Sequence, residues 1–495
     1  MKIELKREGA QGLQKRYFNK TTFRHNTGDQ INLLPYLTNP SGDTFSEDFR
    51  TFHGIVGEIF RIVDSRDNIT ANFDTDLAYK DHLKNTILER AIQVVETDCP
   101  ADLKNLLSKL FFDEENGLIK FDIRTLAYMN FISSNKKITR ISKFIYNIFL
   151  RDLSRDKILN LDGLDSSKKG NLLYQLMIES LPELPIIETA KSTEDDFYNV
   201  FPEIKKVFNQ DFEYLQNDKV FFLKNIECFL KYYYFHYVNQ LILKFRKFGF
   251  EETSIIPVFY TMDWETISES RLANHKVSWK QLNRDSRSLY AHINALELIN
   301  YIYVDDQVLG DYEQVVKVYN ALDHTEQKIF DQKLTEIIDF YTSGVTVFDH
   351  GKGWDKCEEE LELELELKRN TDSLHRLIFT LWYKIKYQFE NSPRSAAYIK
   401  YSKWYWQFAK VNYTKNRGRL GTTTVLSQEM LLFLTRLCIG NEEKIRLKSL
   451  WDEFLKRGIA FDEQTKLEVI KLFEKINLIE KKSDSGDAQY IKSTI

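Results

Sequence analysis

The sequence predicts a predominantly α-helical protein with several domains, and three observations support this fold class. The chain has 495 residues, enough for roughly three domains at about 150 residues each. It contains 19 glycines and 8 prolines, well below their usual shares, so few residues break helices. Hydrophobic residues make up 43% of the chain, and along most of it they recur at spacings of three and four, the period of a helix.

Residues 1–45 are the exception to this helical pattern. They mix short apolar runs with turn signals at His25–Asp29 and Thr38–Asp43, so we expect short strands or irregular structure there. The pattern turns helical from Phe49, and turn signals return at Asp162–Asn171. We therefore divide the chain into four segments. They are a mixed, mainly helical N-terminal domain (1–160), a helical middle domain (161–345), a charged and basic aromatic helical segment (346–425) and a C-terminal module (426–495).

The C-terminal module has the pattern of a winged-helix-like domain. Helical periodicity marks Gln428–Ile439, Arg446–Arg457 and Gln464–Asn477, and extended pieces follow at Leu478–Lys482 and Ala488–Lys492. In such domains the third helix usually enters the major groove of DNA, but here glutamates offset its lysines. We therefore favour partner docking over DNA reading by this module. Its candidate contact residues are Lys466, Lys471, Lys475, Lys481 and Lys482.

No motif in the sequence assigns a catalytic site or a cofactor. The chain lacks the P-loop, the dinucleotide-binding glycine motif, the nucleophile elbow of hydrolases and the zinc motif HExxH. Its nine histidines never recur at a spacing of three to five, so no helix presents a histidine pair to a metal. We expect a protein that is not an enzyme and that uses no cofactor.

A metal-dependent nuclease is one alternative, with Asp355, Glu366 and Lys368 as its residues. Such nucleases place an acid on one strand and E-x-K on the next, so that the carboxylates hold Mg²⁺. The order of the three residues fits this pattern. However, the alternation of leucine and glutamate at Leu361–Leu367 has the period of a strand and the composition of a helix. We favour a helix that continues through Leu377.

The basic aromatic segment Arg394–Arg419 is the strongest functional signal. It holds seven basic residues and no acidic one, in a chain of net charge −4. Lysine and arginine neutralise phosphates, and tryptophan and tyrosine stack on bases or sugars. Alternatively, if Tyr398–Lys410 is helical, Tyr401, Tyr405 and Phe408 form a core stripe with the lysines beside it. The candidate DNA-binding residues are Arg394, Lys400, Lys403, Lys410, Lys415, Arg417, Arg419, Trp404 and Trp406.

Two features concern the location of the protein. The most apolar stretch, Val220–Phe248, is interrupted by charges and is too short without them to span a bilayer. We expect a buried core helix there, with His236 as a core residue and not a ligand, and no contact with membranes. The N-terminus MKIELKREGAQ has no apolar signal core, and four scattered cysteines form no disulfide framework. We therefore expect a cytoplasmic protein.

Four stretches near the two ends of the chain carry a family resemblance. They are INLLPYLTNP at Ile31–Pro40, FHGIVGEIFRIV at Phe52–Val63, LGTTTVLSQEMLLFLTRLC at Leu420–Cys438 and NLIEKKSDSGDAQYIK at Asn477–Lys492. Together with the chain length, they resemble the DptG family, also called DndG. This family belongs to DNA phosphorothioation-dependent restriction systems.

The resemblance implies a role in bacterial antiviral defence. Family members act with two partners, DptF and DptH, on DNA that lacks a sulfur mark on its phosphates. Nucleotide hydrolysis belongs to the partners, which agrees with the missing P-loop. We therefore expect a non-catalytic subunit that bridges a partner ATPase or nuclease to double-stranded DNA through backbone contacts. Besides the nuclease, the alternative is a structural scaffold without DNA binding of its own.

Overall fold

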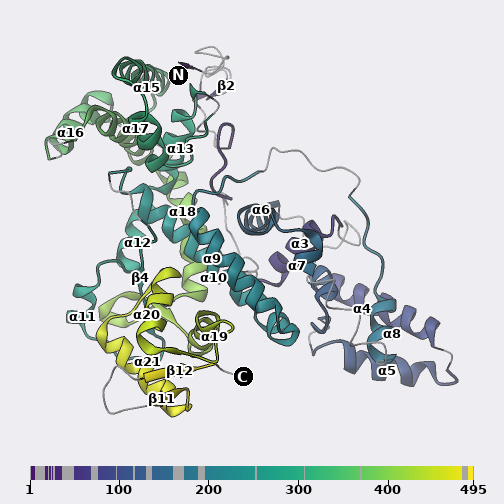
Figure 1. The fold of residues 1–495 in the computed structure, drawn as a ribbon. Helices are drawn as coiled ribbons and strands as arrows, with labels where there is room; N and C mark the ends of the chain where they lie inside the picture. The colour runs from purple at the N-terminus through teal and green to yellow at the C-terminus, as the bar shows by residue number, and fades with distance from the viewer. Residues whose placement is uncertain are drawn as a thin grey trace. The chain divides into compact units, whose positions relative to one another are not determined.

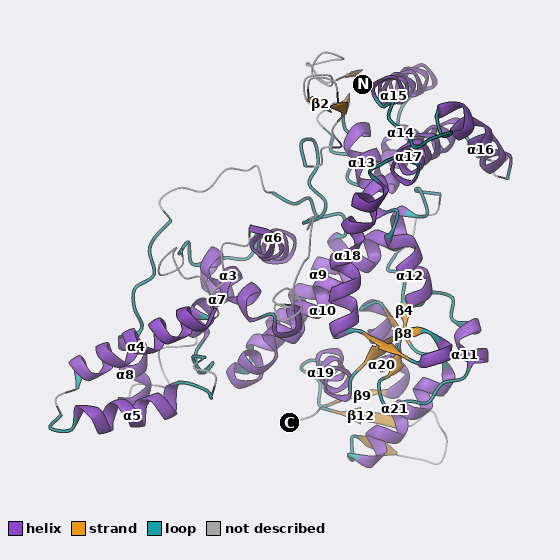
Figure 2. Ribbon diagram, turned by 180° about the vertical axis from the view of Figure 1, so that it is seen from behind, coloured by secondary structure: helices purple, strands orange, loops and turns teal. Residues whose placement is uncertain are grey.

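The computed structural model shows a predominantly helical protein (Figures 1 and 2). The described residues are 2–5, 17–19, 22–23, 25, 28–35, 49–67, 76–95, 97–114, 117–129, 136–159, 172–187, 196–250, 254–305, 307–367, 371–481 and 489–493. They form two compact units. Unit 1 comprises Met1–Gly42, Phe197–Ile204 and Phe235–Ile495, and unit 2 comprises Asp43–Asp196 and Lys205–Tyr234.

Unit 2 consists of helices packed in two groups. Its elements are α3 (His53–Val63), α4 (Asp76–Val94), α5 (Pro100–Phe111), the 3₁₀-helix η1 (Ile123–Tyr128), α6 (Lys136–Ile145), the π-helical turn η2 (Tyr146–Leu150), α7 (Arg155–Leu159), α8 (Leu172–Ser180), and most of α9 (Pro202–Gln216) and of α10 (Lys219–Phe245). Helix α3 packs against α6 and η1, whereas α4 lies beside α5 and α8 (Figure 1). The aromatic rings of Phe149, Phe208 and Tyr233 join η2, α9 and α10, with centroids 4.6–5.9 Å apart.

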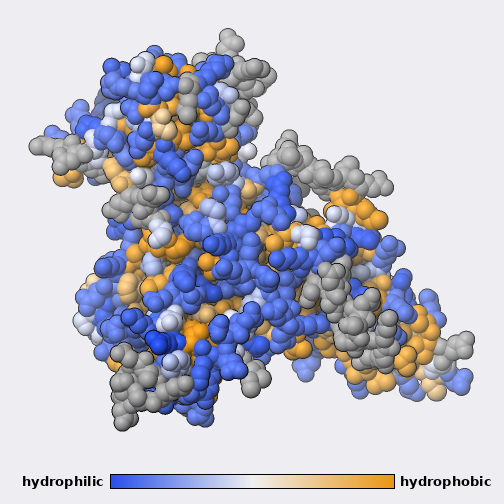
Figure 3. Space-filling view, in the orientation of Figure 1, coloured by the Kyte–Doolittle hydropathy of each residue, from blue (hydrophilic) through white to orange (hydrophobic). Residues whose placement is uncertain are grey.

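Helix α13 (Leu289–Ile299) lies at the centre of unit 1, because all of its 11 residues are buried. Three longer helices pack on it: α15 (His324–Gly344), α17 (Ser373–Glu390) and α18 (Ser395–Asn412). The other helices of this region are α11 (Glu269–Asn274), α12 (Trp279–Ser286), α14 (Tyr312–Asn320) and α16 (Trp354–Glu366). On the face shown in Figure 3, hydrophilic side chains cover much of this unit, with smaller apolar areas between them.

The predicted helix through Leu377 is wrong, because the structure has two helices there. Helix α16 ends at Glu366, and α17 begins at Ser373. Asp372 starts the second helix, since its carboxylate accepts a hydrogen bond from the backbone N–H of His375 at 2.9 Å. The helical nature of Leu361–Glu366 is confirmed, and Leu367 forms the cap of α16.

The last seventy residues contain the three helices and two strands that the sequence predicts, within two residues at each described boundary. They are α19 (Gln428–Ile439), α20 (Leu447–Lys456), α21 (Glu463–Lys475), β11 (Ile479–Lys481) and β12 (Gln489–Lys492), and the structure adds the short strands β9 (Lys444–Arg446) and β10 (Ile459–Ala460). Strands β11, β12 and β9 form an antiparallel sheet in that order (Figure 2). Gly440 and Gly458 end α19 and α20 with positive φ angles. The predicted turn at 483–487 lies outside the described residues.

The buried helix predicted at Val220–Phe248 is α10, whose residues 232–245 are all buried. His236 is a core residue that is 3% exposed, and its burial lowers its pKa to about 3. Its ring lies against Gly458, where an added Cβ would come within 2.1 Å. Of the helices that the structure describes, none is long and apolar enough to cross a membrane.

The N-terminal segment contains the short strands predicted for it, and it joins unit 1. Strand β1 (Ile3–Leu5) pairs antiparallel with β6 (Ile302–Val304), and β2 (Phe18–Asn19) pairs with β3 (Thr22–Phe23). The turn signals at 38–43 lie outside the described residues.

A buried carboxylate fixes the next part of this segment. Glu297 of α13 is fully buried, and it accepts hydrogen bonds from the backbone N–H groups of four consecutive residues at 2.7–3.3 Å. These residues are Gly28, Asp29, Gln30 and Ile31. Burial raises the pKa of Glu297 to about 7, although the four N–H donors favour its charged form. The side chain of Glu297 thus accepts hydrogen bonds from four backbone N–H groups that would otherwise be unsatisfied.

We predict that Glu297→Gln destabilises the protein by about 1–3 kcal/mol, because the amide places two N–H hydrogens among the backbone N–H donors, whereas the protonated carboxyl places one hydrogen there. The raised pKa means that the folded protein retains a proton that the unfolded chain releases above its ordinary pKa of 4.5. The contribution of Glu297 to the free energy of unfolding therefore decreases as pH rises from 4.5 to about 7. The variant has no titrating group at this position, so it does not show this decrease.

Urea unfolding near pH 5 and near pH 8 measures both effects. The difference between wild type and Glu297→Gln should be larger at the lower pH. The exposed Glu179, changed to glutamine, is the control. An equal difference at both pH values would contradict the assigned charge state.

Candidate functional site

Helix α18 carries the basic aromatic segment, and one of its sides lies in the core. Trp404, Tyr405 and Phe408 are each 1% exposed. The Tyr405 hydroxyl donates to Oδ1 of Asn239 at 2.7 Å, and its ring packs 5.8 Å from that of Trp279 on α12. Burial raises the pKa of Tyr405 well above its ordinary value. Of the predicted aromatic stripe, Tyr405 and Phe408 are therefore confirmed as core residues, whereas Tyr401 is half-buried.

The opposite side of α18 presents lysines to solvent. Lys400, Lys403 and Lys410 are exposed, and their spacing of three and seven places them on one helix face. The helix contains no acidic residue. Among the residues that the structure describes, none forms an ion pair with these three lysines. Within the described ranges, their positive charge therefore has no acidic partner.

Trp406 and Arg287 lie at the edge of this lysine face. Trp406 follows Lys403 by three residues, and its ring nitrogen donates to Oγ of Ser286 at 2.9 Å. The guanidinium of Arg287, an exposed residue at the end of α12, lies 5.5 Å from the centre of the Trp406 ring. Sequence reasoning missed Arg287, because only the packing of α12 against α18 brings it to Trp406. The cationic surface thus comprises Lys400, Lys403, Lys410 and Arg287.

Other predicted DNA-binding residues have structural partners. The proposed stacking role of Trp404 is wrong for this structure, because its ring is buried and presents no face to a base. Arg394 donates to the Nδ1 atom of His25 at 2.8 Å, which ties the N-terminal segment to the start of α18. Lys415 donates to the backbone carbonyl of Asp263, whereas Arg419 is exposed.

Arg417 holds together strands from distant parts of the chain. Its guanidinium donates to the backbone carbonyls of Met262 and Glu265, both at 2.7 Å. It lies beyond β7 (Thr414–Asn416), which pairs with β8 (Thr422–Leu426). Strand β8 in turn pairs with β5 (Thr261–Met262), and β10 pairs with β4 (Val258–Phe259), both in parallel. A direct contact of Arg417 with DNA would break these internal bonds.

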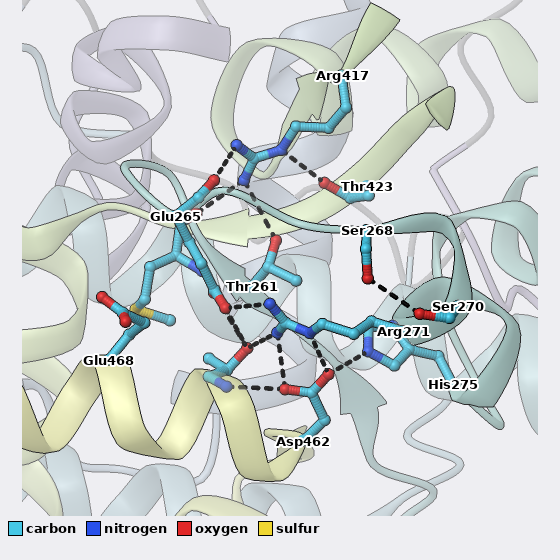
Figure 4. A network of polar contacts seen from close by, with 12 residues as sticks. Thr261, Glu265, Ser268, Ser270, Arg271, His275, Arg417, Thr423, Asp462 and Glu468 are labelled. Carbon is cyan, nitrogen blue, oxygen red and sulfur yellow. Dashed lines mark hydrogen bonds and ion pairs between the residues drawn. The ribbon is translucent and has the colours of Figure 1, made fainter. Parts of the chain in front are cut away.

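A polar network fastens α21 to this sheet region (Figure 4). Arg271 forms a bidentate pair with Asp462, at 2.8 and 3.0 Å, and an ion pair with Glu265 at 2.6 Å. His275 contacts the same Asp462 carboxylate at 3.1 Å. Thr465, fully buried in α21, contacts both Arg271 and Glu265.

The network occupies the N-terminal end of α21. Asp462 is the cap of this helix and accepts the backbone N–H of Thr465 at 2.8 Å. Burial opposes the charge of Asp462, but the hydrogen bonds from Arg271 and Thr465 outweigh it and hold its pKa well below the ordinary value. In a winged helix this end of the third helix would enter the major groove. Here it lies against residues 262–275.

The outer lysines of α21 and β11 are compensated locally. Lys466 pairs with Glu463, Lys471 with Glu468, and Lys481 with Glu474, at 2.7–2.8 Å. The charge balance expected from the sequence is therefore present in the structure. Lys475 is exposed, and Lys482 lies outside the described residues.

Asp355 and Glu366 of the nuclease alternative do not assemble in the predicted way. Asp355 and Glu366 lie at opposite ends of one helix, α16, and not on two strands. Eleven residues of helix separate them by about 16 Å along its axis, so they cannot share one cation. Lys368 lies outside the described residues. Within the described ranges, no group of three or more histidine, cysteine or acidic side chains is placed to hold a metal ion.

These features define a helix-rich protein that exposes a cationic helix face beside a docked C-terminal module. Neither a scan against protein-family models nor a search of the curated proteins finds a match for this chain.

We predict that Arg271→Met destabilises the protein by about 3–5 kcal/mol, because it leaves Glu265 and Asp462 partly desolvated without their shared cation. Arg284→Met is the matched control. Arg284 pairs with Asp285 at 2.8 Å, but its side chain is 62% exposed, and such surface pairs contribute about 1 kcal/mol or less. Urea unfolding followed by tryptophan fluorescence measures both variants. Equal stability losses would show that the network does not hold α21.

Proposed function

We propose that this protein is a non-catalytic subunit of a phosphorothioation-dependent DNA restriction complex. In this proposal, the cationic surface of α18 contacts the phosphates of duplex DNA, and the C-terminal module docks partner subunits. The observation that carries the DNA part is the acid-free lysine face formed by Lys400, Lys403 and Lys410. The sequence resemblance to the DptG family supports the assignment to this class of complex.

The geometry of the lysine face suits a repeating phosphate backbone. Lys400 and Lys410 are separated by ten residues of helix, which is about 15 Å along its axis. Duplex DNA carries one negative charge per roughly 1.7 Å of its axis, so a face of this length meets several phosphates. Lysine recognises a phosphate as a point charge and reads no base sequence. We therefore infer binding that is sequence-independent and sensitive to salt.

The C-terminal module fits partner docking better than groove reading. We infer a winged-helix-like domain from the order of its three helices and from the strands β11, β12 and β9. However, the start of α21 is engaged by Arg271, and three outer lysines of α21 and β11 have acidic partners. A helix whose charges cancel, and whose N-terminal end already contacts Arg271, attracts DNA only weakly.

We predict that the triple variant Lys400→Glu, Lys403→Glu, Lys410→Glu flattens the salt dependence of DNA binding. The slope of log K against log salt should lose about 0.9 for each phosphate contact removed, up to about 3 in total. Fluorescence anisotropy of the chain without partners, at several salt concentrations, measures the slope. The control variant replaces Lys466, Lys471 and Lys475 by glutamate, and it should retain most of the salt slope. An unchanged slope in the α18 variant would overturn this assignment.

We also predict equal affinity for two duplexes of one sequence, one with and one without phosphorothioates. Sulfur replaces a non-bridging oxygen but keeps the charge of the phosphate, and lysine responds to that charge. The same anisotropy titration tests this expectation. A clear difference between the duplexes would place recognition of the mark in this chain and contradict purely electrostatic contact.

A structural scaffold is the second candidate function. The burial of Trp404, Tyr405 and Phe408 favours it, since these aromatic residues of the basic segment serve the core. This candidate predicts no binding of the isolated chain to either duplex at low salt. The anisotropy titration therefore separates the two functions.

A further inference from the structure

Helix α16 exposes two leucines in an acidic setting. Leu363 is 65% exposed and Leu367, the residue that caps the helix, is 84% exposed. They lie one turn apart on the same side, because their spacing is four residues. Only Cys357 and Leu361 of this helix are buried. The helix therefore packs on the rest of the protein through a narrow face and exposes Leu363 and Leu367 to solvent.

Acidic side chains surround this leucine pair. Helix α16 contains seven acidic residues and one lysine. Glu358 pairs with Lys384, and Glu360 accepts from the hydroxyl of Tyr383. In the part of the chain that the structure describes, Glu359, Glu362 and Glu364 form no ion pair. The leucines thus lie between Glu359 and Glu362 on one side and Glu364 on the other, and no described cation compensates these three glutamates.

This arrangement opposes the stability of the helix itself. Like charges four residues apart, such as Glu358 with Glu362 and Glu360 with Glu364, repel each other. Negative charge near the C-terminal end, at Glu364 and Glu366, also opposes the helix dipole. A cationic surface laid along the helix would relieve both effects, and burial of the two leucines would add to the gain.

We propose that this side of α16 is a docking surface for a basic amphipathic helix of a partner protein. Charge complementarity selects the occupant: lysines or arginines would face the glutamates, while apolar side chains would cover Leu363 and Leu367. Duplex DNA is repelled by the same glutamates and offers no apolar face to the leucines. The surface is separate from the cationic surface of α18, so this inference does not rest on DNA binding.

The test uses a synthetic amphipathic peptide with leucines at i, i+3, i+4 and i+7 and lysines on its other positions. A second peptide with serines in place of the leucines has the same charge. We expect the full chain to bind the leucine peptide in fluorescence anisotropy at about 0.1 M salt, and to bind the serine peptide at least about tenfold more weakly.

Two variants of α16 complete the test. Leu363→Ser with Leu367→Ser, and separately Glu359→Lys with Glu362→Lys, should each weaken binding of the leucine peptide by about tenfold or more. Both variants should fold, since the leucines are exposed and the charge reversals reduce repulsion. Leu172→Ser, at a position 81% exposed on α8, and the exposed Glu179→Lys are the matched controls and should leave the affinity unchanged.

The outcomes separate this proposal from other occupants. Equal binding of both peptides, or no effect of the α16 variants, would overturn it. A concentration-dependent dimer in sedimentation velocity that Leu363→Ser with Leu367→Ser abolishes would also overturn it, because a second copy would then cover the surface. The α16 variants should retain the DNA affinity of the wild type, so a failure here and a failure of DNA binding can be told apart.

Discussion

The aromatic side of α18 is anchored in the core of unit 1, and this packing determines where the lysines of the same helix lie. The ring of Tyr401 stacks on that of Tyr290 from α13, with centroids 3.7 Å apart. Tyr398 stacks on Phe389 of α17 at 4.9 Å. Rotation of α18 about its axis would break these contacts and expose Trp404 to water, at a cost typical of a large buried aromatic residue. The lysines therefore keep a fixed direction, although no acidic residue that the structure describes pairs with them.

Buried polar groups complete the frame around this helix. Glu297 holds the backbone of residues 28–31, and Arg394 contacts His25, so the N-terminal segment is attached at two points of unit 1. Arg417 and Arg271 fasten the opposite region, where strands from residues 258–262 and 422–426 meet α21. Each of these groups is satisfied by a partner far away in the sequence. Removal of one partner would leave a buried donor, acceptor or charge uncompensated.

The sequence predicted the helical elements well, because their period and caps are local properties. The predicted helices and strands of the C-terminal module fall within two residues of their expected positions, and the lysine face of α18 follows from its spacing alone. The roles of Arg417 and Arg287 were not predictable in this way. The acceptors of Arg417 are carbonyls more than 150 residues away, and Arg287 reaches Trp406 only through the contact of α12 with α18. Charge and composition identify the segment, but tertiary partners decide which of its cations remain exposed.

The chain as a whole is nearly neutral, but two of its helices carry opposite charges. Helix α16 has seven acidic residues and one lysine, whereas α18 has three lysines and no acid. Both pack against the same helix, α17. Because salt screens exposed charges beyond about 8–10 Å, each helix acts on what touches it and has little effect at the other. DNA attracted to α18 would therefore leave α16 accessible, and a basic partner on α16 would not compete for the lysines. If the proposed function holds, this segregation of charge on separate helices would let the chain hold a polyanion and a basic partner at the same time.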